Sequence, residues 1–289
     1  RRFSFGHEPP DCAPLTTSLQ AEGMKTPPSR PPVSAYIRTR NESRLIGETV
    51  EAALQIAREV VVIDSGSSDD TLDKARAAGA RIIEHEWAGY GFQKRIAEDA
   101  CAHDWLLDLD ADEIVTPALA EEIAALFKDG APSEKVFETP MAVASPVGGV
   151  WRGFGLQKRT KLYDRRAIRM PADLFWDQFK IPPGLPVGRV REPIIHYAVE
   201  DADQLMRKLN KYSTDRAKTA KPRPKSVVIL RIFFGLPVYF LQRYFLEGFF
   251  RGGVYGFSYA LMTSFRRWLV DVKRYEILVL SEKEKARSV

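Results

Sequence analysis

The sequence predicts an α/β fold built on a mostly parallel sheet flanked by helices, and two observations indicate it. Short apolar runs alternate with helix-like segments from Val33 onward, as they do when right-handed crossovers join parallel strands. Polar clusters follow three of these runs, at 39–42, 64–67 and 110–113. Because ligands in such sheets bind beyond the carboxyl ends of the strands, these three loops are expected to form one site.

The individual elements follow from local pattern. Strands are predicted at 33–39, 59–64, 81–84 and 105–109, where short runs are rich in Val, Ile or Leu. Helices are predicted at 45–57, 71–78, 93–101 and 117–127, where apolar residues recur at helical spacing or follow a capping turn. Residues 136–197 are expected to add further strands and loops to the same domain.

Composition divides the chain into three predicted segments. Residues 1–32 are rich in proline and lack periodicity, so we expect them to be disordered, with Met24 as a possible natural start. Residues 33–204 are expected to form the α/β domain, and residues 205–289 a basic, aromatic, helical tail. The two cysteines, Cys12 and Cys101, form neither a metal-ligand spacing nor a disulfide framework, which favours a reducing cytoplasmic setting.

The tail carries most of the positive charge. It holds 18 Lys and Arg against 6 Asp and Glu, a net charge of +12, which leaves −7 for the rest because the whole chain is +5. Its longest uncharged stretches, 232–242 and 254–265, are too short to span a bilayer. We therefore expect helices in the interface of an anionic membrane, with the neighbouring arginines at the headgroups. A helical subdomain packed on the main domain, or an oligomer contact, is the alternative.

Acidic residues at two predicted strand ends are candidate ligand-binding residues. Asp108, Asp110 and Asp112 are spaced by two, so extended backbone would point them the same way, and a divalent cation would relieve their repulsion. The alternative is a solvated acidic turn. Asp64 follows a buried run and gains nothing from burial, which suggests contact with a base or a ribose; the alternative is a helix-capping turn. The glycine spacings of dinucleotide folds and P-loops are absent.

Three segments then resemble family 2 glycosyltransferases, which have the GT-A fold: TRNE at 39–42, VVIDSGSSDDT at 61–71 and LDLDADE at 107–113. GYGFQK at 89–94 and IHY at 195–197 resemble the branch that adds sugars to lipopolysaccharide core, the lipooligosaccharide β-1,4-glucosyltransferase type. The resemblance covers roughly residues 33–213. It implies a Rossmann-like GT-A domain with the tail as a membrane-associating extension.

The resemblance also implies roles for individual residues. The general base would be Asp177, which stands with Trp176 where the branch usually has a His-Glu pair; the alternative is a loop residue paired with Lys180 or Arg159. Mg²⁺ or Mn²⁺ would be held by Asp112 and Asp110. The nucleotide would contact Thr39, Asn41, Glu42, Asp64, Lys94 and Asp110. Arg95 departs from the Asn common at that position.

Other residues of the second half have two interpretations. Trp151 and Trp176 either stack on sugar or pack, and His196 is expected to be structural. Lys158, Arg159 and Lys161 either meet phosphates of the acceptor or form a solvated basic face.

The expected function is inverting, non-processive transfer of a hexose, with glucose as the first candidate, from a UDP-sugar to a hydroxyl of a membrane glycolipid such as lipopolysaccharide core. The Q-x-x-R-W signature of processive synthases is absent. The expected location is cytoplasmic, peripheral on the inner face of the bacterial inner membrane. Another polysaccharide or lipid-linked acceptor, a nucleotidyltransferase and a non-catalytic scaffold are alternatives. So is a nucleic-acid-binding protein, although no nucleic-acid partner is expected because no recognised motif is present.

Overall fold

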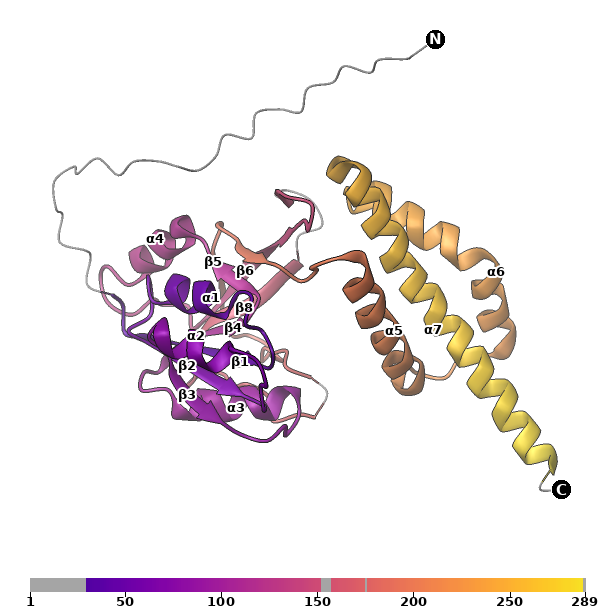
Figure 1. Cartoon of the computed structure of the whole chain (residues 1–289), viewed down its shortest axis with the longest axis horizontal. Helices are drawn as coiled ribbons and strands as arrows, with labels where there is room; N and C mark the ends of the chain where they lie inside the picture. Colours follow the sequence, from indigo (N-terminus) through magenta and orange to yellow (C-terminus); the bar gives the residue numbers. More distant parts are fainter. Residues whose placement is uncertain (1–29, 152–156, 175, 288–289) are drawn as a thin grey trace, which may run out of the picture.

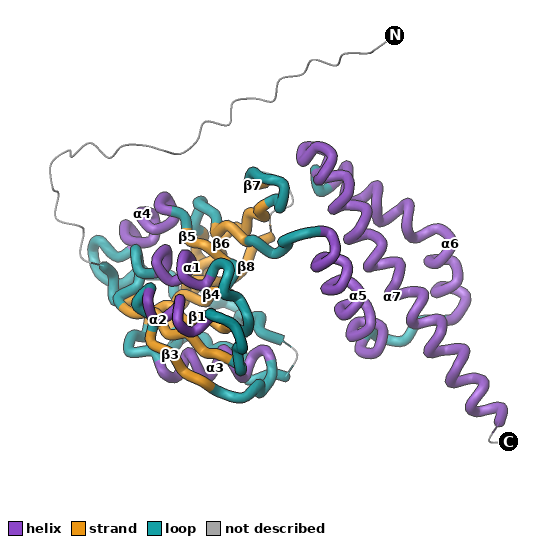
Figure 2. Tube along the Cα trace, viewed as in Figure 1, coloured by secondary structure: helices purple, strands orange, loops and turns teal. Residues whose placement is uncertain are grey.

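The computed structural model describes residues 30–151, 157–174 and 176–287 of the chain (Figure 1). Most of the segment expected to be disordered, residues 1–29, lies outside the described residues. The described chain forms an α/β region and, beyond it, a layer of long helices (Figure 2).

Four parallel strands form the first half of the sheet, as the sequence predicts. They are β1 (Val33–Thr39), β2 (Glu59–Asp64), β3 (Arg81–Glu84) and β4 (Trp105–Asp110), in the order β3-β2-β1-β4. Both β1 and β2 are buried on both faces, which explains the continuous apolar run VVVI within β2.

The second half of the sheet is mixed. Its strands are β5 (Glu113–Val115), β6 (Val136–Ala144), β7 (Val150–Trp151), β8 (Gln157–Asp164), β9 (Val187–Arg189) and β10 (Ile194–His196). β8 runs antiparallel to both β4 and β6, whereas β10 is parallel to β6 and antiparallel to β5. The full order is β3-β2-β1-β4-β8-β6-β10-β5, with β7 and β9 paired to β6.

Helices cover both faces of the sheet. Ala35 and Ile37 of β1 pack in one apolar cluster with α1 (Ile46–Ala53) and α4 (Pro117–Leu126), while Tyr36 packs in another with α3 (Tyr90–Ala100). Strand alternation thus assigns each side chain of β1 and β4 to one of the two faces. The remaining helix of this region, α2 (Thr71–Ala77), follows β2.

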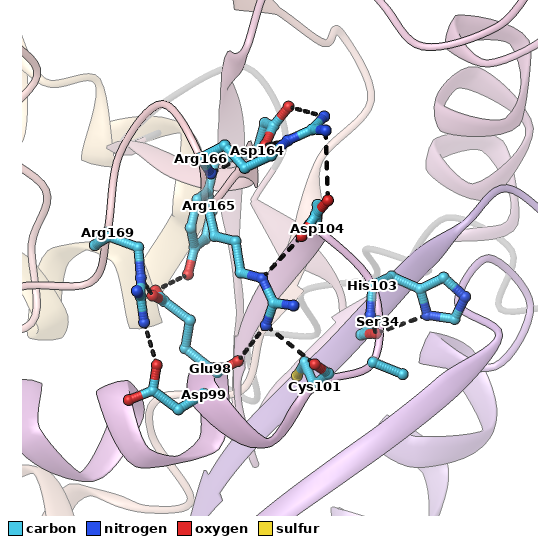
Figure 3. Close-up of polar contacts among 12 residues, drawn as sticks. Ser34, Glu98, Asp99, Cys101, His103, Asp104, Asp164, Arg165, Arg166 and Arg169 are labelled. Carbon is cyan, nitrogen blue, oxygen red and sulfur yellow. Dashed lines mark hydrogen bonds and ion pairs between the residues drawn. The ribbon is translucent and has the colours of Figure 1, made fainter.

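A polar network fixes the chain after β8 to α3 (Figure 3). Arg169 pairs with Glu98 and Asp99 at the end of α3, and Glu98 also accepts a hydrogen bond from the Met170 amide at 2.8 Å. Arg165 reaches the carbonyls of Glu98 and Cys101 at 3.1 and 3.0 Å. This anchoring holds the start of the segment that leads to Asp177.

The same segment caps α3, which starts three residues before the sequence predicts. The amides of Tyr90 and Gly91 donate to the carbonyls of Leu174 and Asp173 at 3.1 and 2.9 Å. Carbonyls from about 80 residues away therefore satisfy amides that an isolated helix end leaves free. Gly89 has φ +120°, a conformation that glycine adopts readily.

The tail is helical, as predicted. It comprises α5 (Ala202–Thr219), α6 (Lys225–Leu241), which continues as the π-helix η1 (Gln242–Leu246), the 3₁₀ turn η2 (Phe249–Gly252) and α7 (Gly253–Arg287). α7 packs against both α5 and α6. The sheet ends at His196 and α5 begins at Ala202, so the predicted division at 204/205 lies close to this break and stays a prediction.

Trp151 of β7 joins the helices of the tail to the sheet, because it packs on Phe249 and Tyr259. Of its two interpretations, the structure therefore supports packing.

Among the described residues, one helix, Lys225–Leu246, is long and apolar enough to cross a membrane by length and composition. The prediction from the sequence considered only uncharged stretches, which are too short to span a bilayer. It therefore missed this longer helix, which includes Arg231 and Arg243.

Candidate active site

The carboxyl ends of β1, β2 and β4 meet at one edge of the sheet. Parallel pairing places Thr39 beside Asp64 and Arg38 beside Asp110 in the strand register. The three polar loops predicted to share a site therefore do lie together, at the edge where α/β sheets bind ligands.

Asp64 organises the turn after β2. Its side chain is buried and accepts hydrogen bonds from the amides of Gly66 and Ser67, both at 2.8 Å, and from the Ser67 hydroxyl at 2.5 Å. Asp64 thus stabilises the turn itself, before α2 begins at Thr71, and its contact with a nucleotide stays a prediction.

Asn41 joins the loop after β1 to this turn. Its side-chain oxygen accepts from the Ser68 amide at 2.8 Å, and its own amide donates to the Ser67 hydroxyl at 2.8 Å. Asn41 has φ +53°, a left-handed conformation that asparagine tolerates better than most residues. The loops that carry the predicted nucleotide-binding residues Asn41 and Asp64 are therefore hydrogen-bonded to each other, and we call the surface that they form the nucleotide wall.

Thr39 and Glu42 retain polar groups that a ligand can use. The Thr39 hydroxyl is buried and makes no hydrogen bond to any residue in the described part of the chain. Such an atom calls for a partner that the protein alone does not supply. Burial, reinforced by the charge of Asp112, raises the pKa of Glu42 to about 7. A carboxyl group that can donate as well as accept is therefore available near neutral pH.

Lys94 of α3 lies among the carboxylates of β4. Its ammonium is 2.8 Å from Asp108 Oδ1 and 3.0 Å from Asp110 Oδ1, and 2% of its side chain is exposed. Burial opposes its charge, but these two carboxylates raise the pKa of Lys94. Burial likewise opposes ionisation of Asp110, but Lys94 and Arg38 hold its pKa well below the usual range. Both groups are charged at neutral pH.

The three aspartates, expected from their spacing to point the same way, have different partners: Asp108 and Asp110 contact Lys94, whereas Asp112 contacts His196. Asp108 and Asp110 both point toward α3, as strand alternation requires. β4 ends at Asp110, however, and the chain turns through Ala111 and Asp112 before β5. The alternation stops where the extended backbone stops. The Lys94 ammonium contacts both Asp108 and Asp110 and so relieves the repulsion between them.

Asp112 faces His196 of β10. Its Oδ2 lies 3.4 Å from His196 Nε2. Burial opposes both charges, but the contact lowers the pKa of Asp112 and raises that of His196. β10 reaches this position because it pairs with β5, with His196 opposite Glu113. The structural role expected for His196 overlooked this contact, since the two residues are far apart in sequence.

Asp177 lies at the same cluster. Its Oδ2 is 3.2 Å from Arg38 Nη1 and 3.7 Å from Lys94 Nζ, so its ion-pair partners are these residues rather than Lys180 or Arg159. Arg38 also contacts Asp110 at 3.2 Å. Sequence reasoning missed Arg38, although a lone charge in the apolar strand VSAYIRT was a usable signal.

Lys161 supports the site from beneath. It is buried, and its ammonium lies 2.5 Å from Glu113 Oε2, which also accepts from the Asp110 amide at 2.9 Å. Burial rules out the solvated face that was one interpretation of Lys161. Contact with an acceptor phosphate stays a prediction, because Lys161 also lines the cavity beside the site. The charge of Lys161 is used to fix the turn that carries Asp110 and Asp112.

A cavity of about 370 Å³ opens beside these groups. Its lining includes Lys94, Asp110 and Asp177, and also Lys158 and Arg159 of β8. The α7 residue Tyr259 also lines this cavity, so the tail contributes to the cavity lining. This volume falls in the range typical of small-molecule sites, roughly 300–1,000 Å³.

Asp112 and His196 are the residues that best fit a divalent metal. They offer one carboxylate oxygen and one imidazole nitrogen, a pair that suits Mn²⁺ and is less typical of Mg²⁺. Asp110 is already held by Lys94 and Arg38. No group of three or more His, Cys, Asp or Glu in the described ranges could hold a metal ion. Phosphate oxygens of a substrate would have to complete the coordination.

Residues 34–137 match the family model described as glycosyl transferase family 2. An uncharacterized glycosyltransferase of Rickettsia felis is 29% identical over 265 residues, which cover 89% of this chain and 94% of that protein. A lipopolysaccharide core biosynthesis glycosyltransferase of Rhizobium meliloti is 29% identical over 255 residues, or 85% of this chain and 92% of the relative.

Solved structures also match part of the chain. Glucosyl-3-phosphoglycerate synthase from Mycobacterium tuberculosis, in complex with Mn²⁺, UDP and glucosyl-3-phosphoglycerate, is 23% identical, with a TM-score of 0.34. The match covers 44% of this chain and 52% of that enzyme, so it spans about half of the enzyme's length. A mycobacterial protein is 18% identical with a TM-score of 0.44, over 66% of this chain and 76% of the other.

Proposed function

Because the chain is a glycosyltransferase with a family 2 domain at residues 34–137, we propose that it transfers a hexose from a UDP-sugar to a hydroxyl group of a membrane glycolipid. The observation that carries the proposal is the pairing of Asp177 with Arg38 and Lys94 beside Asp112 and His196, at the ligand-binding edge of the sheet. The lipopolysaccharide-core relative supports a glycolipid acceptor, and glucose is the first donor to test.

The donor nucleotide would bind against the wall formed by the loops after β1 and β2. This nucleotide wall includes Thr39, Asn41, Glu42 and Asp64. The Thr39 hydroxyl, which has no hydrogen-bond partner among the described residues, supports a polar contact with the nucleoside. Asp112 and His196 would hold a divalent metal, Mn²⁺ or Mg²⁺, that neutralises charge on the leaving diphosphate when it is bound. Lys94 adds a fixed positive charge close by.

The acceptor would react on the side of Asp177. We assign Asp177 as the base that takes the proton of the acceptor hydroxyl while that oxygen forms its bond to the anomeric carbon and the diphosphate oxygen leaves. Attack opposite to the leaving group inverts the configuration. Arg38 and Lys94 keep the Asp177 carboxylate in one place, which is the precondition for such a transfer.

The proposed place of action is the cytoplasmic side of the inner membrane. The basic, aromatic tail supports a membrane location, and Tyr259 of α7 connects the tail to the cavity. Lys158 and Arg159 line the same cavity, where an anionic acceptor would meet them. Another polysaccharide or lipid-linked acceptor would use the same chemistry.

The test is release of UDP from a panel of UDP-sugars, with Mn²⁺ or Mg²⁺ and a membrane-lipid extract as acceptor. Asp112→Ala should abolish metal-dependent release, whereas the exposed loop variant Asp129→Ala should leave it unchanged. Transfer by the wild-type protein that persists in EDTA would contradict the metal assignment. Absence of both UDP binding and sugar transfer would overturn the proposed reaction.

A further inference from the structure

The outer side of α6 and η1 is a continuous apolar surface. We define the α6 apolar face by its most exposed large side chains between 230 and 245, which recur at helical spacing: Leu230, Phe233, Phe234, Val238, Leu241 and Phe245. Phe233 is 74% exposed and Phe234 64%. All exposed residues from 227 to 246 are uncharged.

The inner side of the same helix carries its polar contacts, beside buried apolar residues such as Val228. Arg231 pairs with Asp271 of α7 at 3.0 Å, and the Tyr239 hydroxyl donates to the same carboxylate at 3.1 Å. Trp268 of α7 donates its indole N–H to the Ile232 carbonyl at 2.8 Å. α6 thus leaves its largest apolar side chains exposed and turns its internal arginine inward, whereas a helix in a water-soluble bundle buries its apolar side.

We propose that the α6 apolar face is embedded in the hydrocarbon of a lipid bilayer. In lipid, polar groups must be satisfied inside the protein, and here the charge within α6 is paired with α7. Basic residues flank the face, with Arg223 and Lys225 before it and Arg251 after it. Such residues can reach the headgroups while their stems lie along apolar surface.

The neighbouring helices decide how α6 lies in the membrane. Twenty-two residues from Lys225 to Leu246 span about 33 Å, enough to cross a bilayer core. α7, however, packs along both α6 and α5, and α5 exposes Arg207, Lys211 and Asp215. A crossing would carry these charges into the hydrocarbon at high cost. α6 therefore lies lengthwise in one leaflet, with α5 on the far side of α7 (Figure 1).

Arg231 has a different role from the one expected of it. The sequence assigned Arg231 to the headgroups, but the structure turns it toward Asp271. Attachment then depends mainly on hydrocarbon contact and only secondarily on anionic lipid. Salt discriminates between the two, because 1 M salt reduces the screening length to about 3 Å and leaves apolar burial intact.

The test is flotation of the full-length protein with neutral phosphatidylcholine vesicles at 0.1 and 1 M NaCl. The wild-type protein should float at both salt concentrations. The double variant Phe233→Glu/Phe234→Glu should partition at least about 10-fold less, because each ring loses its transfer free energy. The matched variant Phe233→Leu/Phe234→Leu should still float. This readout involves no sugar transfer, so it stands or falls separately from the proposed reaction.

A second measurement guards against a misfolded Glu variant. In Phe234→Trp, lipids brominated on the acyl chains should quench the new fluorescence beyond the quenching seen for the parent protein. No added quenching would overturn the proposal. So would flotation restricted to anionic vesicles and lost at 1 M NaCl, or a soluble dimer that does not float, which would show that a second copy covers the face.

Discussion

Gly91 offers a sharp test of how the proposed base is positioned. A Cβ atom at this position would lie 2.1 Å from the Pro171 carbonyl oxygen and 2.5 Å from that of Trp176. Contacts below 3.0 Å essentially do not occur for real Cβ atoms, and both obstacles are backbone. In Gly91→Ala the segment that leads to Asp177 must therefore move by about 1 Å.

A displacement of this size should affect catalysis more than folding. Misplacing a reacting group by about 1 Å costs on the order of 10²-fold in rate. The nucleotide wall at Asn41 and Asp64 belongs to other loops, so it should not move. We expect kcat for transfer to fall about 10²-fold in Gly91→Ala, with UDP affinity unchanged.

Gly47→Ala is the matched control. Gly47 lies in α1, and a Cβ there would meet nothing within 4 Å. Alanine should even stabilise that helix, by up to about 1 kcal/mol. The assay compares UDP release with lipid extract and UDP binding by calorimetry for both variants. Wild-type kcat in Gly91→Ala would refute the reasoning that the close approach at α3 places Asp177.

Three other predictions follow from the charges of the site. Lys94→Met should lower the free energy of unfolding by about 3–5 kcal/mol in urea titrations, because Asp108 and Asp110 lose their buried partner, whereas the exposed Lys74→Met should change it by less than about 1 kcal/mol. Because the folded-state pKa of Glu42 is raised, the stability that it contributes in EDTA should be present below pH 4.5 and lost as pH rises toward 7. The Tm of Glu42→Gln should therefore exceed that of the wild type by an increasing margin across this pH range. Tm values of the two proteins that change in parallel with pH would contradict this prediction. Asp112 raises the pKa of His196, so a metal must displace a proton there, and Mn²⁺ affinity of the UDP complex should increase with pH in wild type but not in His196→Ala, as calorimetry at several pH values would show.

Local pattern was sufficient for the parallel half of the sheet. The segment EVVVID at 59–64 predicts a strand buried on both faces, and β2 has these bounds. The start of α3 was not predictable in this way, because the carbonyls of Asp173 and Leu174 that cap it come from a distant loop. The pairing of Arg38 with Asp177 likewise joins residues 139 positions apart. Such contacts depend on tertiary structure and leave no local periodicity.

The tail shows the same limit in another form. Its composition predicted apolar helices with spaced arginines, which the structure confirms. Composition does not tell which side an arginine takes, however, and Arg231 turns inward because Asp271, forty residues later, lies on α7. The direction of a helix face is set by its partner rather than by its own sequence.

The pairing of Asp110 with Lys94 and Arg38 has a thermodynamic consequence. It leaves the proposed metal with only two protein ligands, Asp112 and His196, so most of the coordination must come from the diphosphate of the donor. Metal and nucleotide are then linked ligands. Each should increase the affinity of the other by the same factor, since the coupling free energy is shared. Before the donor arrives the protein would hold the ion weakly, and after the product nucleotide leaves it would release the ion again.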